Sequence, residues 1–397
     1  MNHIKSLFLL SLLSLLASCI DFDDATQTVS VAVQLEQPEG ATVSLAGQRI
    51  TLSGTETLSA ITDANGVARF DDIVPGIYNI STAWKLTARE YAILTGQPQE
   101  NKSYTVSGSL NALQLTGQSD PVTLPVTLTQ DQSIVISKVY YNGSKDLNNR
   151  NYINGKYIEL YNNSDETVDV AGLYVALLES ESAVAYQPGQ VPDTVFAKQV
   201  FRLPPSVPHP VPAGGSVLLV NSAIDHSVNG DFEPDLLDAD YEATDSRGTH
   251  VNNPATPKLE LIYTAYATTT YMNLVQGGPC SIVIFETDED ITQWPIVYAY
   301  GKTRGTRMME IPTSAVIDGV EILKNRAQTG PDVNAKRLFD YIDATYAFTN
   351  TVSGYNGELV YRKVSATTDD GRPTLADTNN SLNDFGISSE LKPRQYE

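Results

Sequence analysis

The chain has 397 residues and a formal net charge of −21, and 18% of its residues are charged. This length allows two or three domains with hydrophobic cores, and 21 Tyr and 10 Phe are unlike the composition of a disordered chain. The excess of acidic over basic residues, 47 against 26, repels phosphate and argues against nucleic acid as a partner. A sequence rich in Thr, Val and Tyr favours strands over helices.

The N-terminus has the pattern of an export signal. Lys5 precedes an apolar run over residues 7–17, which is shorter than the roughly 20 residues of a membrane-spanning helix. Small residues then precede Cys19, so the pattern predicts a signal peptide over residues 1–18. The block resembles the bacterial lipobox, which implies that Cys19 is acylated and anchors the mature chain in a lipid bilayer. An ordinary secretory signal peptide cleaved nearby is the alternative.

Residues 19–27 form an acidic tether in this interpretation. Asp21, Asp23 and Asp24 follow the cysteine closely. They resemble the export signal that sends lipoproteins of Gram-negative gut anaerobes to the outer face of the outer membrane. The resemblance implies a lipid-anchored protein that faces the cell exterior; a plain solvated tether and the periplasmic face are the alternatives.

Cysteine and histidine are too sparse for most site chemistry. Cys280 lies in an apolar run and has no partner for an intrachain disulfide once Cys19 is acylated, so we expect a buried strand cysteine. The three histidines beyond the signal peptide, His209, His226 and His250, lack metal-ligand spacing. We therefore expect no metal site and no cofactor.

Residues 28–130 contain short alternating runs separated by turn residues. Strands are predicted at 29–33 and 122–128 from their period of two. Between them, T-D-A-N-G-V-A-R-F at 62–70 and P-G-I-Y at 75–78 each place a tight turn before apolar residues. These motifs resemble the prealbumin-like (carboxypeptidase-regulatory or SpaA-type) β-sandwich. The resemblance implies a non-catalytic spacer or docking module.

A second module is predicted over residues 132–385. Its four apolar segments lie at 134–141, 157–164, 168–175 and 211–220. In this order, with Y-I-E-L-Y-N and P-A-G-G among them, they resemble the lamin-tail-like, immunoglobulin-like sandwich. Residues 222–275 and 286–365 exceed that family's pattern and are predicted to be insertions or extensions, and 386–397 form a C-terminal tail.

The ending D-T-N-N-S-L-N-D-F at 377–385 completes a pattern that spans the whole chain. Together with the two modules it resembles an uncharacterised surface-lipoprotein family of Gram-negative gut anaerobes. Members of that family tend to accompany TonB-dependent transporters, which implies such an outer-membrane transporter as a partner.

No catalytic constellation is predicted. Gly301-Lys302-Thr303 is similar to the end of a phosphate-binding loop, but Ile296 stands where that motif needs glycine. A G-x-S-x-G nucleophile motif is absent from the sequence. The acidic segments around Asp235 and Asp369 do not reproduce a calcium loop, so we interpret them as solvated turns, and a bound calcium ion is the alternative.

The candidate binding residues lie in the predicted insertions. Lys302, Arg304 and Arg307 form a basic cluster that could hold a partner's carboxylates, and local charge balance is the alternative. Tyr263 and Tyr266 could offer a stacking surface, and packing in or beside the sandwich core is the alternative.

The fold predicted from these patterns is mostly β, with two sandwiches and little helix. Residues 313–325, after Pro312, are the best helix candidate. The function predicted is that of a non-enzymatic, lipid-anchored surface protein that binds a ligand or accompanies a transporter. A polysaccharide-acting enzyme with an unrecognised site, or an adhesin, are the alternatives.

Overall fold

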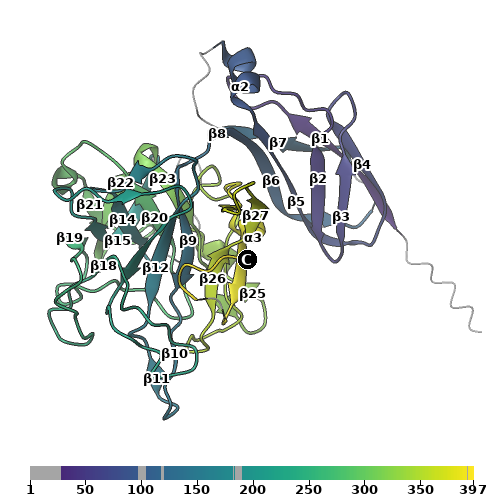
Figure 1. Cartoon of the computed structure of the whole chain (residues 1–397). Helices are drawn as coiled ribbons and strands as arrows, with labels where there is room; N and C mark the ends of the chain where they lie inside the picture. The colour runs from purple at the N-terminus through teal and green to yellow at the C-terminus, as the bar shows by residue number, and fades with distance from the viewer. Residues whose placement is uncertain (1–27, 97–103, 118–119, 182, 184–189, 391) are drawn as a thin grey trace, which may run out of the picture. The chain divides into compact units, whose positions relative to one another are not determined.

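The computed structural model describes two compact units of the chain (Figure 1). One unit comprises Met1–Thr82 and Ser109–Val126, and the other comprises Ala83–Gly108 and Thr127–Glu397. The residues that the structure describes are 28–96, 104–117, 120–181, 183, 190–390 and 392–397. The predicted signal peptide, Cys19 and the three tether aspartates lie outside the described residues.

Eight strands form two sheets in the first third of the chain. They are β1 (Val29–Glu36), β2 (Arg49–Gly54), β3 (Thr57–Ile61), β4 (Val67–Ile73), β5 (Gly76–Leu86), β6 (Tyr104–Leu115), β7 (Val122–Pro125) and β8 (Thr127–Gln130). One sheet has the order β4-β1-β7 and the other β3-β2-β5-β6-β8. In β1 every second residue from Val29 to Leu35 is buried, as the period of two predicted.

The tight turn predicted at D-A-N-G is present before β4, and Asp63 stabilises it in a way that was not predicted from the sequence. The Asp63 carboxylate accepts hydrogen bonds from the backbone N–H groups of Asn65 and Val67, at 2.8 and 3.1 Å. Gly66 has a φ of +79°, a conformation that residues with a Cβ rarely adopt. The turn therefore depends on side-chain capping at one position and on glycine at another.

The helix α2 (Ala88–Thr95) was not predicted from the sequence. Thr87 accepts a hydrogen bond from the Glu90 N–H, and Glu90 accepts one from the Thr87 N–H, which is a complete capping box. Gly96 ends the helix in the left-handed conformation. The T-x-x-E spacing at residues 87–90, followed by a glycine, is typical of a short capped helix. The expectation of strands, which came from composition, did not take this spacing into account.

Two large sheets form the main sandwich of the second unit. The six-stranded sheet has the order β18 (Tyr241–Glu242), β17 (Ser216–Val220), β12 (Tyr157–Asn162), β9 (Ile134–Tyr140), β26 (Leu359–Arg362) and β29 (Phe385–Ser388). The seven-stranded sheet has the order β21 (Ile296–Tyr298), β22 (Arg307–Pro312), β15 (Thr194–Arg202), β14 (Tyr174–Leu178), β20 (Ile282–Phe285) and β23 (Val316–Val320), with β19 (Glu260–Thr264) also on β15.

Short elements complete this unit. Two-stranded pairs are formed by β10 (Ser144–Lys145) with β11 (Asn151–Tyr152), β13 (Val168–Asp169) with β16 (Pro210–Val211), β24 (Asn325–Arg326) with β25 (Gly330–Pro331), and β27 (Val364–Thr367) with β28 (Pro373–Leu375). The helical turns are η1 (Ile291–Gln293), η2 (Thr313–Ala315), η3 (Val333–Ala335) and α3 (Ser381–Asp384).

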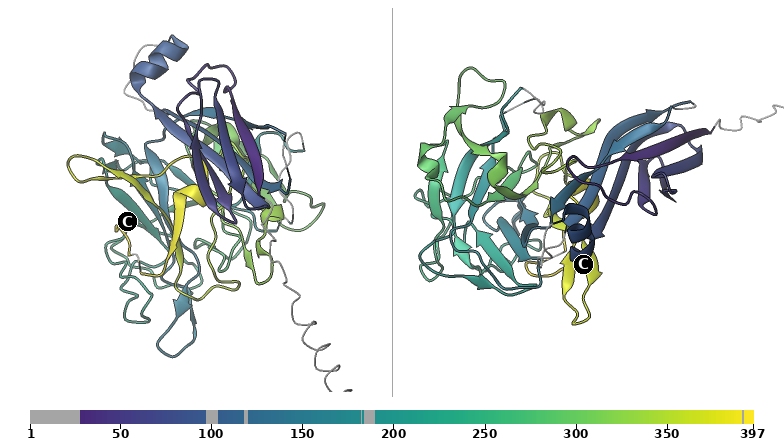
Figure 2. Two further views of the ribbon diagram at one scale, coloured as in Figure 1. Left: turned by 90° about the vertical axis from the view of Figure 1, so that its right-hand side faces the viewer. Right: turned by 90° about the horizontal axis from the view of Figure 1, so that it is seen from above.

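The core of the second unit lies between the two large sheets (Figures 1 and 2). Ile158 and Leu160 of β12 belong to the same buried cluster as Val175 of β14 and Ile284 of β20. Cys280 is 3% exposed and belongs to this cluster, so its predicted burial is confirmed, but it lies two residues before β20 and not in the strand. The predicted fold class, mostly β with sandwiches and little helix, is confirmed.

The helix predicted at residues 313–325 is wrong. After the single turn η2, the chain forms strand β23, which pairs with β20 from Ile282↔Val320 to Phe285↔Val316. β-Branched residues such as Val316, Ile317 and Val320 favour a strand. Hydrogen bonding to the neighbouring strand β20 outweighs the helix-start preference of Pro312, so this segment forms a strand. Among the described residues, no helix has the length and apolar character needed to cross a membrane.

Candidate functional site

The structure gathers the predicted basic residues on one exposed hairpin. Strands β21 and β22 pair antiparallel, with Tyr298 opposite Arg307, and the connecting residues 299–306 carry Lys302 and Arg304. All three basic side chains are exposed. We call residues 296–312 the basic hairpin.

The local structure of this hairpin places Lys302 and Arg304 on an exposed turn, while the Arg307 guanidinium donates to the Ile296 carbonyl of β21. The Lys302 N–H donates to the Ala299 carbonyl at 2.9 Å, which closes a tight turn, and Gly301 and Gly305 both have positive φ. Ala299 at the start of the turn is buried and Tyr300 packs against the same buried cluster, whereas residues 301–305 are exposed. Met308 and Met309, the next residues of β22, are buried and tie the hairpin to the sandwich.

Tyr263 contacts this hairpin directly. Its hydroxyl donates to the backbone carbonyl of Arg307 at 2.7 Å. The contact arises because β22 pairs with the first half of β15 and β19 pairs with the second half, which places β19 beside the start of β22. Burial raises the pKa of the Tyr263 hydroxyl, and the nearby Arg307 charge opposes that rise.

Tyr266 lies just beyond β19 and is half-buried. Burial raises the pKa of its hydroxyl, and the carboxylate of Glu181 adds to the effect. Tyr263 also packs against the second buried cluster of the unit, which includes Phe196 and Met309. Both tyrosines therefore belong in part to the rim of the core, the alternative that the sequence left open.

The three basic side chains of the hairpin have no ion-pair partner among the described residues, although the Glu181 carboxylate lies near Gly305. Within the part of the chain that the structure describes, none of the ion pairs involves Lys302, Arg304 or Arg307. Other cations of this acidic chain do have partners: Arg202 pairs with Glu260 at 2.6 Å and Arg394 with Asp240 at 2.9 Å. What distinguishes the hairpin is that three exposed cations lie within six residues of one another, two on the turn and Arg307 at the start of β22.

Acidic side chains of the two suspected calcium segments have structural partners instead. Asp240 accepts from the Leu218 N–H at 2.7 Å, and Asp377 pairs with Arg362 at 3.0 Å. Asp245 accepts from the backbone N–H groups of Arg247 and His250. Among the described residues, no group of three or more histidines, cysteines or carboxylates has an arrangement that could hold a metal ion.

A buried charge cluster that the sequence did not reveal lies in the ending of the second module. Arg362 of β26 donates to Asp318, Asp377 and the carbonyls of Ile136 and Ala376. Asp384 lies 3.7 Å from the same guanidinium, and burial raises the pKa of this carboxyl to about 6. Because these residues connect β9, β23, β26 and α3, we interpret the cluster as structural.

Part of this chain is similar to a known protein family. The model described as "Protein of unknown function (DUF4876)" matches residues 212–391. Comparison with curated proteins gives no significant match.

Two solved structures are similar to the chain. A DUF4876 family protein from Bacteroides thetaiotaomicron VPI-5482 has 20% sequence identity and a TM-score of 0.56, over 90% of this chain and 94% of that one. A DUF3823 family protein from Parabacteroides merdae ATCC 43184 has 14% identity and a TM-score of 0.16, over 49% of this chain and 79% of that one. The first likeness shows a shared fold, and residues 212–391 of this chain are similar to the DUF4876 family model.

Proposed function

We propose that this protein is a non-enzymatic surface protein, anchored by acylated Cys19 to the outer membrane, that docks an acidic partner through the basic hairpin. The observation that carries the docking proposal is the hairpin itself. It presents three exposed cations, at 302, 304 and 307, that form no ion pair with any described residue, in a chain whose net charge is −21.

Physical chemistry supports an acidic partner. An acidic protein is repelled by acidic partners everywhere except where a local cationic surface offsets the field. Rim charges of this kind set the association rate and the orientation of a complex more than its affinity. Tyr263, which hydrogen-bonds to the hairpin, and Tyr266 supply aromatic surface beside the cations, and aromatic residues are enriched in interfaces.

The anchor and the export signal rest on the residues around Cys19. The apolar run, the small residues and the acidic tether are what support a surface lipoprotein. A protein held at the outer membrane in this way meets other outer-membrane proteins at high local concentration. We propose a TonB-dependent transporter as the partner.

The test is capture of the partner from native membranes in mild detergent, followed by mass spectrometry. The variant carries Lys302→Glu, Arg304→Glu and Arg307→Glu. The matched control carries Arg69→Glu, Arg89→Glu and Arg247→Glu, three exposed positions with the same change in net charge. We expect the hairpin variant to lose at least tenfold in captured partner at low salt, the control to lose less than twofold, and the difference to shrink as salt rises.

Two results would contradict the proposal. Equal losses in the two triple variants would mean that net charge, not the hairpin, controls association. Full capture by the hairpin variant would move the docking surface elsewhere on the chain.

A further inference from the structure

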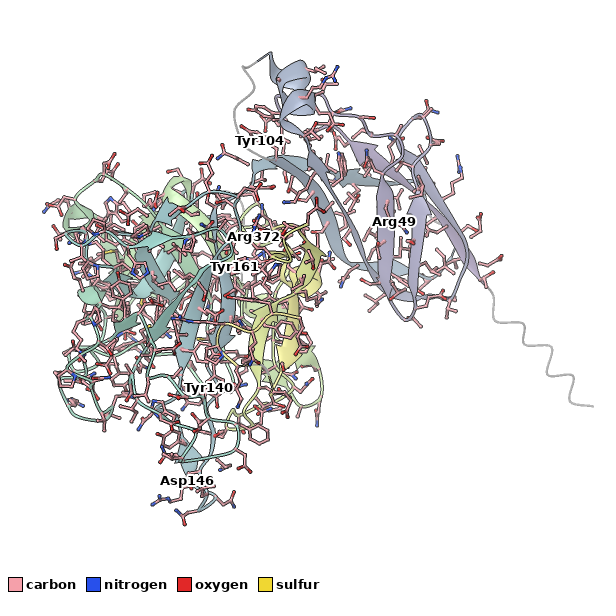
Figure 3. All side chains as sticks on the ribbon, in the orientation of Figure 1. Arg49, Tyr104, Tyr140, Asp146, Tyr161 and Arg372 are labelled. Atoms are coloured by element: carbon pink, nitrogen blue, oxygen red, sulfur yellow. The ribbon has the colours of Figure 1, made fainter. Side chains whose placement is uncertain are left out.

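Three loops converge at the end of the second unit where the β10–β11 hairpin projects. The Leu147 N–H donates to the Asn229 carbonyl at 2.9 Å, and the Gly357 N–H donates to the Gly143 carbonyl at 3.0 Å. In Figure 3 Tyr140 lies near one end of the sheet, and the hairpin that carries Asp146 projects beyond that end. The loops come from distant parts of the sequence and are held by these backbone contacts.

A hollow of about 430 Å³ lies in the loop after β17. It is lined by Ser227, Glu233, Asp235, Leu237, Asp238, Lys392 and Pro393. This volume falls within the range of sites that hold small organic ligands. A second, polar hollow of about 120 Å³ has no comparable mixture of charge and exposed apolar surface.

Glu233 is the buried member of the lining. Its Oε1 accepts hydrogen bonds from the Tyr140 hydroxyl at 2.8 Å and the Ser144 hydroxyl at 2.6 Å. Its Oε2 has no hydrogen-bond partner among the described residues. Burial raises the pKa of this carboxyl, and the positive charges of Lys156 and Lys392 oppose the rise. An acceptor oxygen left without a donor in a buried position is costly, so the site favours a positive charge nearby.

The exposed surroundings combine carboxylates with apolar side chains. Asp235 and Asp238 are exposed, and Asp238 lies 3.6 Å from the guanidinium group of Arg394, so with Glu233 three carboxyl groups stand against two cations, Lys392 and Arg394. Leu237 in the lining is 57% exposed, and Val228 and Phe232 in the same loop are 66% and 42% exposed. Leu237 lines the hollow itself, and the exposure of two further large apolar side chains in the same loop indicates a recognition surface.

We propose that this hollow binds a small organic ammonium ion with an apolar body, such as an alkylammonium or arylammonium. The carboxyl groups would attract the ammonium group, and Leu237 and its apolar neighbours would cover the body of the ligand. Anionic ligands are disfavoured by the three carboxyl groups. This site uses none of the residues of the basic hairpin, so it stands or falls independently of the proposed docking function.

The test uses the full-length chain and three probes of the same shape. 2-Phenylethylammonium carries the positive charge, 2-phenylethanol is neutral, and phenylacetate is negative. We expect the ammonium probe to bind at least tenfold more tightly than the other two, measured by titration calorimetry with thermal-shift confirmation. Its affinity should rise with pH, because Glu233 with its raised pKa loses its proton.

Variants localise the binding. The double variant Asp235→Asn with Asp238→Asn should bind the ammonium probe at least tenfold more weakly than the parent. Leu237→Ser should lower the affinity for all three probes. Asp71→Asn with Asp369→Asn is the matched control, with two exposed carboxylates removed elsewhere, and should change affinity less than twofold. All these positions are exposed, so the variants are expected to fold.

Three outcomes would overturn the proposal. Equal affinity for the three probes would show an apolar site without charge selection. An equal loss in the control variant would show a general electrostatic effect. Unchanged binding in the hollow variants, or preferential binding of an uncharged polyol such as maltose, would place a different chemistry or a different site on this chain.

Discussion

The guanidinium of Arg362 donates to both carboxylate oxygens of Asp318, at 3.0 and 2.8 Å, and the two side chains are only 2% and 4% exposed. This buried pair joins the six-stranded sheet, through β26, to the seven-stranded sheet, through β23. Asp377 and Asp384 bring the chain's D-T-N-N-S-L-N-D-F segment to the same arginine. The ending of the second module is therefore held to the sandwich by charge as well as by packing.

Arg362→Met tests this cluster. The substitution keeps an unbranched side chain but leaves three buried carboxyl groups without their cation, so we expect the free energy of unfolding to fall by about 3–5 kcal/mol. Chemical denaturation followed by circular dichroism measures the change. Arg372→Met, which removes a partly exposed arginine paired with the exposed Asp165, is the comparison and should cost less than about 1 kcal/mol beyond lost packing. Similar losses in both variants would refute a special role for Arg362.

Asp384→Asn should change stability in a pH-dependent way. Burial raises the pKa of Asp384 to about 6 in the folded state, so the folded chain holds a proton that the unfolded chain has already released. The contribution of this group to stability is therefore present at low pH and is lost as pH rises from about 4 to 6. Asparagine mimics the protonated form. We expect the variant to gain about 2–3 kcal/mol relative to the parent between pH 3.5 and pH 7, measured by denaturant unfolding. A constant difference across that range would contradict the shift.

His250→Phe should show the opposite dependence. Neither ring nitrogen of His250 has a hydrogen-bond partner among the described residues, and burial lowers its pKa to about 4. Asp245 and Glu242 favour its charged form, whereas Lys156 and His226 disfavour it. The unfolded chain therefore binds the extra proton between about pH 4 and 6.5, and the parent loses stability as pH falls through that window.

The phenylalanine variant cannot titrate and keeps a flat ring beside Tyr271, whose centroid lies 4.5 Å from that of His250. Relative to the parent, we expect it to gain about 2–3 kcal/mol on acidification from pH 7 to pH 4. Thermal unfolding at matched ionic strength measures the difference, and the comparison between two chains cancels the opposing titration of Asp318 and Asp384. If the stability of the variant and of the parent changed in parallel with pH, the pKa of His250 would not be lowered in the folded state, and this prediction would be wrong.

Cys19→Ala tests the proposed anchor. The variant should lack a lipid and should leave the membrane fraction, since several apolar chains are needed for stable attachment and the acidic chain has no electrostatic hold on an anionic surface. Fractionation in high salt with metabolic labelling by a fatty acid measures both properties. Continued sedimentation of the unlabelled variant with outer membranes would mean that another part of the chain, or a partner, provides the attachment.

The acidic tether makes a separate prediction. Replacing Asp21, Asp23 and Asp24 by Ala should move the protein from the outer surface to the periplasmic face while leaving lipidation unchanged. Protease shaving of intact cells measures surface exposure, and shaving of lysed cells is the control for intrinsic susceptibility. Equal digestion of the variant and the parent on intact cells would remove these three residues from the export signal.

Local patterns in the sequence predicted several of the longer strands. Alternation predicted β1 and the apolar segments predicted β9, β12 and β17, because the period of side-chain burial in a strand is a local property. The D-A-N-G turn was predictable for the same reason, since its capping bonds span only four residues. The capping box of α2 was equally local and could have been predicted, whereas the supposed helix at 313–325 failed because β20 offered Val316–Val320 a pairing edge.

Only the tertiary structure decided which distant residues meet. Arg362, Asp318 and Asp384 form one buried cluster although up to 66 residues separate them, and no spacing rule links residues that different strands bring together. The contact between Tyr263 and Arg307 depends on two strands that share one edge of β15, and the hollow around Glu233 depends on a turn that meets residues near the C-terminus. The sequence determined the chain's charge, its strands and its export pattern by itself. Which strands pair with one another depends on backbone hydrogen bonds between segments that are distant in the sequence. That pairing determines which side chains come together on the surface.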